Sequence, residues 1–325
     1  MKNIPAFKSQ FKNQFKQYIE FKQMLGYKFT GNIENIRQLD VYIAALPTIE
    51  HCFNKELVEA YITRRPGENP STQSNRVSTV RCFGKYLVRK GIEAYVLPNG
   101  VLPVAKYRFI PHIFNKEEVD KLLYAAESLP QRANSCHRHI VFPMMFKLIY
   151  GCGLRISEAS NLLLGDVNLQ NGVLLIRGTK FNKDRYTPMA QSLLQCCRRY
   201  TEEILAKTDV SSPFFPSPGN GFYSSSTIGH AFRQCLVIAG IPHYDDGPTV
   251  HSLRHSFAVR NLVKWSEENK DINAMLPYLS AYMGHENLLG TERYLRLTLE
   301  AFPQIRKQIN AGCSWIMPEV ACHEE

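Results

Sequence analysis

A stretch with three prolines and no helical periodicity divides this chain of 325 residues: residues 97–112, L-P-N-G-V-L-P-V-A-K-Y-R-F-I-P-H. Proline lacks a backbone N–H and disfavours helical backbone in the residue before it, so neither a helix nor a central strand continues through such a segment. The chain length also suits about two domains. We therefore expect a first domain over residues 1–97, a linker over 98–112, a second domain over 113–311 and a tail over 312–325.

Positive charge is concentrated in the first third of the chain. Residues 1–110 contain 17 lysines and arginines against 8 aspartates and glutamates, a net charge of +9 out of +10 for the whole chain. Apolar side chains recur there at helical spacing in four successive segments. A charge excess confined to one segment favours a surface that binds a polyanion. The first domain is therefore predicted to be a basic four-helix bundle that binds nucleic acid.

The fourth predicted helix, residues 71–91, carries a row of basic residues. Arg81, Lys85 and Arg89 are spaced four residues apart, and no acidic residue occurs between Ser71 and Ile92. Such a row is either a solvated helix face or a surface that lies against DNA phosphates, and the local charge excess favours DNA. The predicted DNA contacts, including residues of the linker and of a later basic loop, are Arg76, Arg81, Lys85, Arg89, Lys90, Lys106, Arg108 and Lys183.

The second domain begins with a helix signal. Asn115 and Glu118 have the spacing of a capping box, which predicts a helix that reaches about Ser128. Residues 139–150 are mostly apolar and predict a buried helix, which the glycines at 151 and 153 interrupt. A further helix is expected over residues 154–164, with Arg155 in its first turn.

Residues 172–178 are rich in β-forming side chains, and residues 185–188 can return as an antiparallel partner strand. The residues between them are predicted to form a basic hairpin loop. The remaining segments of the domain read mostly as helices. The fold class predicted for the chain is therefore mainly α with a small antiparallel β-sheet (α+β).

Nine cysteines are scattered through the chain without a C-x-x-C pair. The first residues lack the apolar run of a signal peptide, and no stretch of 18 uncharged apolar residues suggests a membrane span. Reduced thiols without a secretion signal are typical of intracellular proteins. We expect a cytoplasmic protein with no membrane association.

Residues 251–297 combine side chains that suit phosphate chemistry. They include H-S-L-R-H at 251–255, G-H-E-N at 284–287 and T-E-R-Y-L at 291–295. Arginine forms bidentate contacts with phosphoryl oxygens, histidine carries protons, and tyrosine serves as a nucleophile. His251 and His255 have the i, i+4 spacing of zinc ligands, but the glutamate of H-E-x-x-H and a nearby third ligand are lacking. No metal is expected, and His255 is given a structural role.

Five sequence blocks, taken in order, resemble those of the tyrosine recombinases, the phage integrase family. The blocks are G-C-G-L-R-I-S-E at 151–158, the strand-loop-strand around Lys180, H-S-L-R-H-S-F-A at 251–258, M-G-H-E-N at 283–287 and T-E-R-Y at 291–294. The resemblance covers about residues 114–299. It implies an N-terminal helical bundle and a recombinase catalytic domain that form a clamp around DNA.

The resemblance also implies the role of each residue in the reaction. Tyr294 would attack the scissile phosphate and form a 3′-phosphotyrosyl intermediate, as a covalent nucleophile does. Arg155 and Arg254 would bind the non-bridging oxygens and stabilise the charge of the transition state. Tyr282 precedes G-H-E-N instead of following it, so it is the weaker candidate for the nucleophile.

Proton transfer is assigned in the same way. Lys180 would protonate the leaving 5′-oxygen, with Lys183 in the same loop as the alternative donor. His251 would assist proton transfer around the nucleophile, and His285 would hydrogen-bond the phosphate. Glu158, one helical turn after Arg155, would orient that guanidinium or else remain a plain surface carboxylate.

The resemblance further implies double-stranded DNA sites as substrates and a homotetramer acting on two sites, with accessory DNA-bending or directionality proteins as further partners. It implies integration or site-specific recombination of the kind that mobile genetic elements use, with no cofactor and no ATP. Two alternatives remain: type IB topoisomerase activity and a DNA-binding regulator without turnover. The C-terminal segment would dock into a neighbouring subunit or pack on its own domain, and its apolar candidates are Ile305, Ile309, Trp315 and Ile316.

Overall fold

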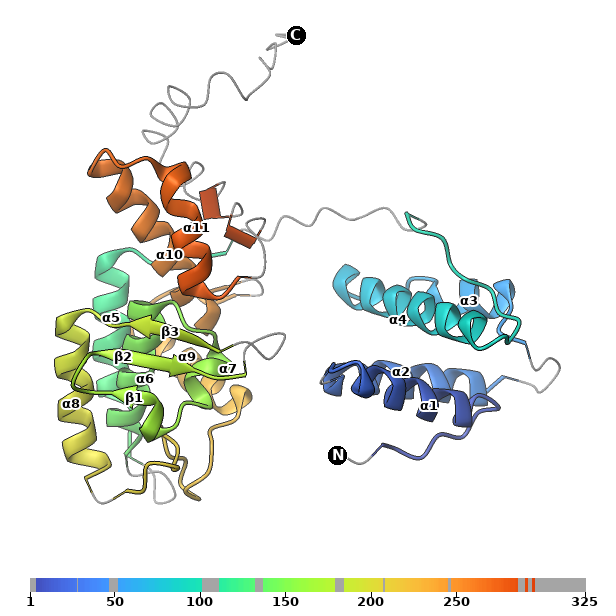
Figure 1. Ribbon diagram of the computed structural model, residues 1–325, viewed down its shortest axis with the longest axis horizontal. Helices are drawn as coiled ribbons and strands as arrows, with labels where there is room; N and C mark the ends of the chain where they lie inside the picture. Colours follow the sequence, from blue (N-terminus) through green and yellow to red (C-terminus); the bar gives the residue numbers. More distant parts are fainter. Residues whose placement is uncertain are drawn as a thin grey trace, which may run out of the picture. The chain divides into compact units, whose positions relative to one another are not determined.

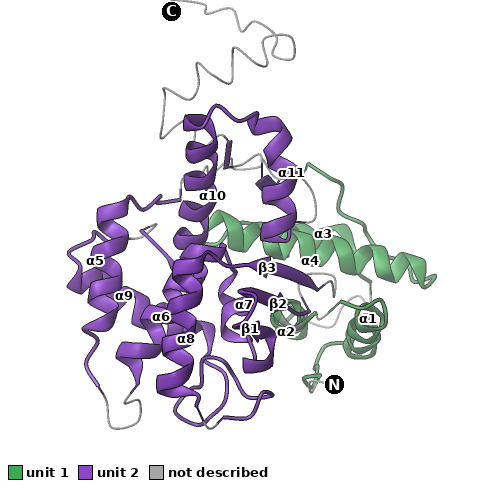
Figure 2. Ribbon diagram, turned by 60° about the vertical axis from the view of Figure 1, so that its left-hand side comes forward, with its two compact units in different colours: residues 1–108 green, residues 109–325 purple. Residues whose placement is uncertain are grey.

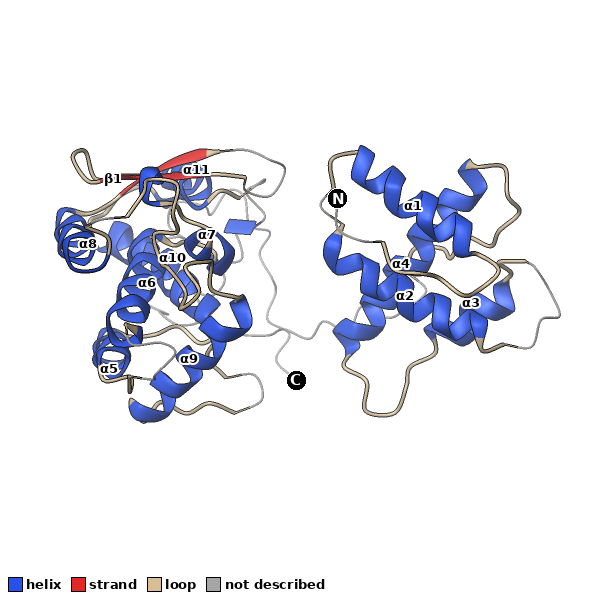
Figure 3. Cartoon of the chain, turned by 90° about the horizontal axis from the view of Figure 1, so that it is seen from below, coloured by secondary structure: helices blue, strands red, loops and turns tan. Residues whose placement is uncertain are grey.

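The computed structural model describes residues 4–27, 29–46, 52–100, 111–131, 137–178, 184–206, 208–244, 247–285, 290–291 and 294–295. The chain divides into two compact units, residues 1–108 and 109–325, and each unit has its own apolar core (Figure 2). Helices dominate both units, and the strands lie together in the second (Figure 3). The predicted fold class is confirmed. The predicted linker lies mostly outside the described residues, and the predicted tail lies wholly outside them.

The first unit contains the four predicted helices, which are α1 (Lys12–Met24), α2 (Thr30–Ala44), α3 (Lys55–Ile62) and α4 (Pro70–Arg89) (Figure 1). Its core is rich in aromatic rings: Phe11, Phe15 and Phe53 each contact Phe83 of α4, with ring centroids 4.5–6.2 Å apart. Helix α4 begins where the side chain of Asn69 accepts the N–H of Ser71, followed by a proline at the first helical position.

The second unit is built around a central apolar helix. Its helices are α5 (Lys116–Glu127), α6 (Arg138–Cys152), α7 (Ile156–Ser160), α8 (Gln191–Ile204), α9 (Ser225–Ile238), α10 (Val250–Glu267) and α11 (Ile272–Met283), with a 3-10 turn η1 (Leu164–Asp166). Helix α6 packs against α5, α8 and α10, which explains why nearly all of its side chains are apolar. The predicted capping box is present, since Asn115 and Glu118 each accept the backbone N–H of the other at 2.9 Å. Among the described residues, no helix is both long and apolar enough to span a membrane.

A small antiparallel sheet lies beside these helices, in the order β1 (Val167–Asn168), β2 (Val173–Ile176) and β3 (Arg185–Pro188). The two predicted strands are confirmed as β2 and β3, with Leu174 opposite Thr187. Strand β1 was not predicted, because two residues are too few to show an alternating pattern. The first residue of β3 is the point where the sheet meets the site described below.

The helix predicted over residues 154–164 is much shorter than expected. Arg155 has an extended backbone at the N-cap of α7, and this helix has only five residues. Beyond it the backbone bonds to a distant loop: the N–H of Leu164 donates to Ser212, that of Gly165 to Val210, and Leu162 accepts from Phe214. These long-range hydrogen bonds replace the helical ones, so the prediction of a continuous helix is wrong.

Gly153 ends α6 in a left-handed conformation, with φ of +61°. A Cβ at this position would lie 2.5 Å from Cδ1 of Phe257 in α10. Gly153→Ala should therefore add about 1–2 kcal/mol of backbone strain and about 1–3 kcal/mol from displacing the ring. The measurement is the free energy of unfolding from denaturant titration. Gly240→Ala is the matched control, because Gly240 has φ of +65° and no atom within 4 Å of the added Cβ. An equal decrease in the free energy of unfolding of the two variants would contradict the explanation by packing against Phe257.

Candidate active site

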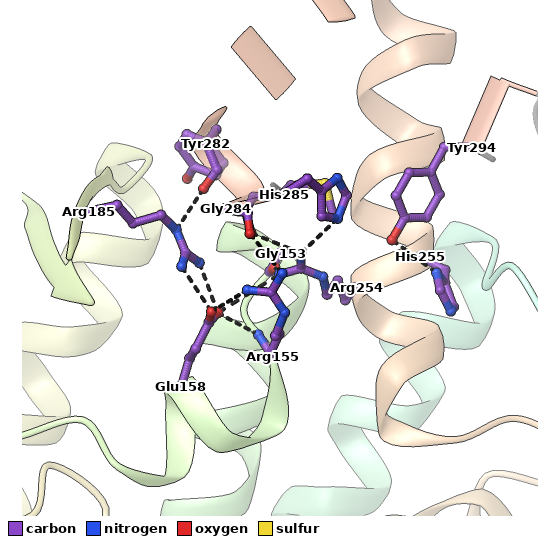
Figure 4. A network of polar contacts seen from close by, with 11 residues as sticks. Gly153, Arg155, Glu158, Arg185, Arg254, His255, Tyr282, Gly284, His285 and Tyr294 are labelled. Carbon is purple, nitrogen blue, oxygen red and sulfur yellow. Dashed lines mark hydrogen bonds and ion pairs between the residues drawn. The ribbon is translucent and has the colours of Figure 1, made fainter. Parts of the chain in front are cut away.

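Two predicted catalytic arginines, Arg155 and Arg254, lie around the buried carboxylate of Glu158 (Figure 4). His285 contacts Arg254, and Tyr294 stacks on His285. Arg155 lies at the N-cap of α7, and Glu158 lies within that helix. Arg254 comes from α10, and His285 follows Gly284, the left-handed residue that ends α11. Segments more than 100 residues apart in the sequence therefore meet at one place.

Glu158 accepts hydrogen bonds from two arginines. Its Oε1 accepts from Nη1 of Arg155 at 2.6 Å and from Nη1 of Arg185 at 2.9 Å. Its Oε2 accepts from the backbone N–H of Arg155 and from Nη2 of Arg185, both at 2.8 Å. Burial alone would raise the pKa of this carboxyl, but the hydrogen bonds and charge of Arg185, and then those of Arg155, outweigh burial and lower it to about 2. Glu158 is therefore ionised at neutral pH and contacts Arg155 as the sequence suggested.

Arg254 is almost completely buried, with 1% of its surface exposed. Its Nη1 donates to the carbonyl of Gly153, and its Nη2 donates to the carbonyl of Met283 at 2.9 Å. The nearest oxygen of Glu158 is 3.8 Å away. Burial, followed by the charge of Arg155, lowers the pKa of Arg254 to about 10. The guanidinium remains charged at neutral pH and is held by backbone carbonyls.

His285 links Arg254 to the segment that carries the tyrosine. Its Nε2 lies 3.0 Å from Nη2 of Arg254, and its Nδ1 lies 2.8 Å from Oγ1 of Thr291. A guanidinium only donates, so Nε2 must accept and Nδ1 must carry the hydrogen. Burial and the charge of Arg254 lower the pKa of His285 to about 4. The ring is therefore neutral at physiological pH.

Tyr294 is 3% exposed and belongs to an apolar cluster formed with residues of α10 and α11. Its ring stacks on His285, with centroids 5.8 Å apart and planes at 15°. Its hydroxyl lies 3.2 Å from Nδ1 of His255. His251, one turn earlier in α10, is exposed, and its ring meets that of His255 edge-on at 4.6 Å. Tyr294 therefore contacts His255 and His285, and His251 contacts His255 in turn.

Sequence reasoning assigned His255 a structural role, whereas the structure places it at the hydroxyl of the predicted nucleophile. Its i, i+4 spacing from His251 was a signal that both rings share one face of the helix. The weaker candidate, Tyr282, is engaged elsewhere: its hydroxyl donates to the carbonyl of Pro188 at 2.7 Å, and its ring stacks on Phe257.

Arg185 was missed altogether. Besides its two bonds to Glu158, its Nε donates to the carbonyl of Tyr282 at 3.0 Å. It therefore joins β3 to α7 and to the end of α11. The available signal was a charged residue at the first position of a strand, but nothing in the sequence identified its partners.

The predicted DNA contacts of the first unit differ in their exposure to solvent and in their hydrogen-bond partners. Arg76 is 1% exposed, forms an ion pair with Glu68, and donates to the carbonyls of Tyr61 and Thr63. Its prediction as a DNA contact is corrected, because its donors hold α4 to the end of α3 and to the loop between these helices. Arg81 donates to the carbonyls of residues 97 and 98 at 3.0 and 2.9 Å. Among the members of this set that the structure describes, Lys85, Arg89 and Lys90 are exposed.

Several predicted residues lie outside the described residues, and their roles stay predictions: Lys106, Arg108, Lys180, Lys183, Ile305, Ile309, Trp315 and Ile316. Within the described part of the chain, no three histidine, cysteine, aspartate or glutamate side chains gather in a way that could hold a metal ion.

The hydrogen bonds to Glu158 predict that replacing Arg185 lowers the stability of the protein by an amount that depends on pH. In Arg185→Met the buried carboxylate keeps only part of its partners, so the free energy of unfolding should fall by roughly 3 kcal/mol at pH 7. The depressed pKa of Glu158 contributes stability above its usual value of 4.5, and this contribution is lost as the pH falls towards 2. The difference between wild type and variant should therefore narrow below pH 4.5.

Chemical denaturation of the second unit at several pH values measures this effect. Lys264→Met is the matched control, because Lys264 forms an exposed ion pair with Glu268 at 3.7 Å, and its loss should change stability little. If the difference in free energy of unfolding between wild type and Arg185→Met stays constant down to pH 3, Glu158 is not the titrating partner.

The sequence of this chain is similar to those of known proteins. Residues 112–300 match the sequence profile of the Phage integrase family. The Sinorhizobium fredii protein y4rB, which carries an integrase/recombinase name, is 31% identical over 307 residues, or 93% of this chain and 97% of that protein. Tyrosine recombinase XerD of Pseudomonas putida is 27% identical over 248 residues, or 74% of this chain and 76% of that protein.

Solved structures share the fold. XerH site-specific recombinase bound to its palindromic difH substrate matches with a TM-score of 0.61 at 18% identity, covering 88% of this chain and 80% of that chain. Tn1549 transposon integrase in complex with circular intermediate DNA also matches with a TM-score of 0.61, at 17% identity, covering 86% of this chain and 94% of that chain. The chain therefore belongs to the phage integrase family of tyrosine recombinases and is an enzyme that cleaves and rejoins DNA.

Proposed function

We propose that this chain is a site-specific DNA recombinase that uses Tyr294 as its nucleophile. One arrangement carries the proposal: the ring of Tyr294 stacks on His285, and His285 contacts the buried guanidinium of Arg254. The tyrosine and the arginine are therefore joined through a single histidine. Phosphoryl transfer needs a nucleophile close to fixed positive charge, and this arrangement supplies both.

In the proposed reaction the Tyr294 hydroxyl attacks the scissile phosphate and forms a 3′-phosphotyrosyl bond, while the 5′-oxygen leaves. The covalent bond conserves the energy of the phosphodiester, so a 5′-hydroxyl from a second strand can attack it and restore the backbone. Two such exchanges pass through a Holliday junction. The cycle consumes no ATP and requires no metal ion.

Arg155 and Arg254 would bind the non-bridging oxygens of the phosphate. They are held at the end of α11, where Arg155 donates to the carbonyl of Gly284 at 2.8 Å and Arg254 donates to that of Met283 at 2.9 Å. A guanidinium has five N–H donors. Arg155 uses two of them, on Glu158 and Gly284, so it keeps donors for a phosphoryl oxygen. Arg254 uses three, on Gly153, Met283 and His285, and also keeps donors for the phosphate. Removing one such donor typically slows catalysis by about 10²–10³-fold.

Proton transfer would involve the remaining predicted residues. Lys180, or Lys183 in the same loop, would protonate the leaving 5′-oxygen, and His251 would assist proton transfer around the nucleophile. His285 would hydrogen-bond the phosphate. Because a phosphoryl oxygen only accepts, Nε2 of His285, which accepts from Arg254 in the free protein, would have to carry the ring hydrogen when DNA is bound. Glu158 would hold Arg155 in position.

The substrates would be two double-stranded DNA sites, which the basic first unit would help to hold. We propose a homotetramer on these two sites, in the cytoplasm, with accessory DNA-bending or directionality proteins as further partners. The net charge of +9 over residues 1–110 supports the DNA-binding part of this proposal.

Tyr294→Phe should abolish covalent capture of a nicked suicide substrate, because it removes the attacking oxygen. Gel separation of protein–DNA adducts measures this effect, and junction formation from two sites distinguishes recombination from topoisomerase-like relaxation. Tyr282→Phe is the matched control and should still form the adduct, since its hydroxyl contacts Pro188. An adduct in Tyr294→Phe would refute the proposed nucleophile.

Replacing Lys85 and Arg89 together with glutamine should weaken DNA binding and flatten its salt dependence. Each lost phosphate contact lowers the slope of log K against log salt by about 0.9, so the pair should lower it by up to about 2. Titration of labelled DNA at several salt concentrations gives the slope. Lys12 and Lys16 on α1 are an exposed pair with the same spacing, and their replacement is the control. An equal slope for the Lys85/Arg89 variant and wild type would place the DNA surface elsewhere.

A further inference from the structure

The buried hydroxyl of Tyr294 has a histidine nitrogen within hydrogen-bonding reach. Nδ1 of His255 lies 3.2 Å from the tyrosine oxygen, and both side chains are buried, with exposures of 7% and 3%. The two rings have centroids 5.4 Å apart and planes at 54° (Figure 4). A buried tyrosine hydroxyl needs a polar partner, and His255 is a partner that can also accept a proton.

The other two histidines near Tyr294 are placed for different tasks. His285 presents its ring face to the ring of Tyr294, and its two nitrogens meet Arg254 and Thr291. A stacked ring is poorly oriented for in-plane proton transfer from the hydroxyl. His251 lies on the exposed side of α10 and touches His255 ring to ring. His255 is therefore the histidine placed to receive the proton of the Tyr294 hydroxyl, and His251, which assists proton transfer in the proposed function, contacts the ring of His255.

We propose that His255 is the general base that takes the phenolic proton of Tyr294 during DNA cleavage. The inference rests on the proposed function and adds a catalytic residue to it. As the bond from the Tyr294 oxygen to phosphorus forms and the bond from phosphorus to the 5′-oxygen breaks, the phenolic proton moves to Nδ1 of His255. The resting ring is then neutral with its hydrogen on Nε2, and it becomes an imidazolium. A separate acid protonates the 5′-oxygen.

Religation reverses these steps. The 5′-hydroxyl attacks the phosphotyrosine and gives its proton to the conjugate base of the separate acid. The bond from phosphorus to the Tyr294 oxygen breaks, and His255 returns its proton to the phenolate. A free phenol has a pKa near 10 and is a weak nucleophile at neutral pH. A positioned base therefore has a large effect, typically about 10²–10⁴-fold in rate.

The test compares single-turnover formation of the covalent adduct on a nicked suicide substrate. In His255→Asn the amide places a polar atom close to the position of Nδ1 but cannot take up the proton. Its rate should fall by about 10²–10⁴-fold, with DNA affinity and melting temperature close to wild type. His230→Asn, at an exposed position of α9, is the matched control and should react at the wild-type rate. If the asparagine variant melts early, His255→Gln replaces it.

A second substrate, with sulfur in place of the bridging 5′-oxygen, separates the two proton transfers. The thiolate leaves without protonation, so it should restore cleavage to a variant that lacks the acid but not to His255→Asn. Rescue of His255→Asn by sulfur, or a rate equal to or above wild type on the ordinary substrate, would overturn the assignment. Absence of adduct in the wild-type protein would instead refute the proposed function.

Discussion

The candidate active site depends on the buried carboxylate of Glu158. It bonds Arg155 and Arg185 at 2.6–2.9 Å, while Arg254 lies 3.8 Å away. One negative charge therefore faces three guanidinium groups in a region that largely excludes water. The remaining positive charge is costly in a buried site, and a phosphate that enters it would relieve that cost. The same interaction that holds the arginines in place thus leaves the site prepared for an anion.

The C-terminal ends of two helices also hold the arginines in place. Helices α6 and α11 both finish on a glycine in the left-handed conformation, Gly153 and Gly284, with φ of +61° and +67°. The carbonyls at these two ends accept hydrogen bonds from Arg254 and Arg155. Helix C-termini carry partial negative charge, so they favour cations. Donors that are fixed before the substrate arrives need no reorganisation during the reaction, which is the basis of electrostatic catalysis.

The sequence predicted those parts of the molecule that depend on local pattern: the four helices of the first unit, the capping box at Asn115 and the strands β2 and β3. Prediction from the sequence failed where contacts between residues far apart in the chain determine the structure. The helix after Arg155 stops because its backbone bonds to residues 210–214. The sequence alone does not distinguish Arg76 from the exposed basic residues of α4. In the structure it is buried, pairs with Glu68 and donates to two backbone carbonyls. His255 meets Tyr294 only because the fold brings together residues 39 positions apart.

The central claim is that Tyr294, held among the histidines of this site, is the residue that joins the protein to DNA. Mass spectrometry of the trapped adduct after protease and nuclease digestion tests it most directly. We predict a single nucleotide-bearing peptide in which the phosphoryl group is attached to Tyr294 and the DNA retains a free 5′-hydroxyl. Attachment to Tyr282 or to any other residue would contradict the account.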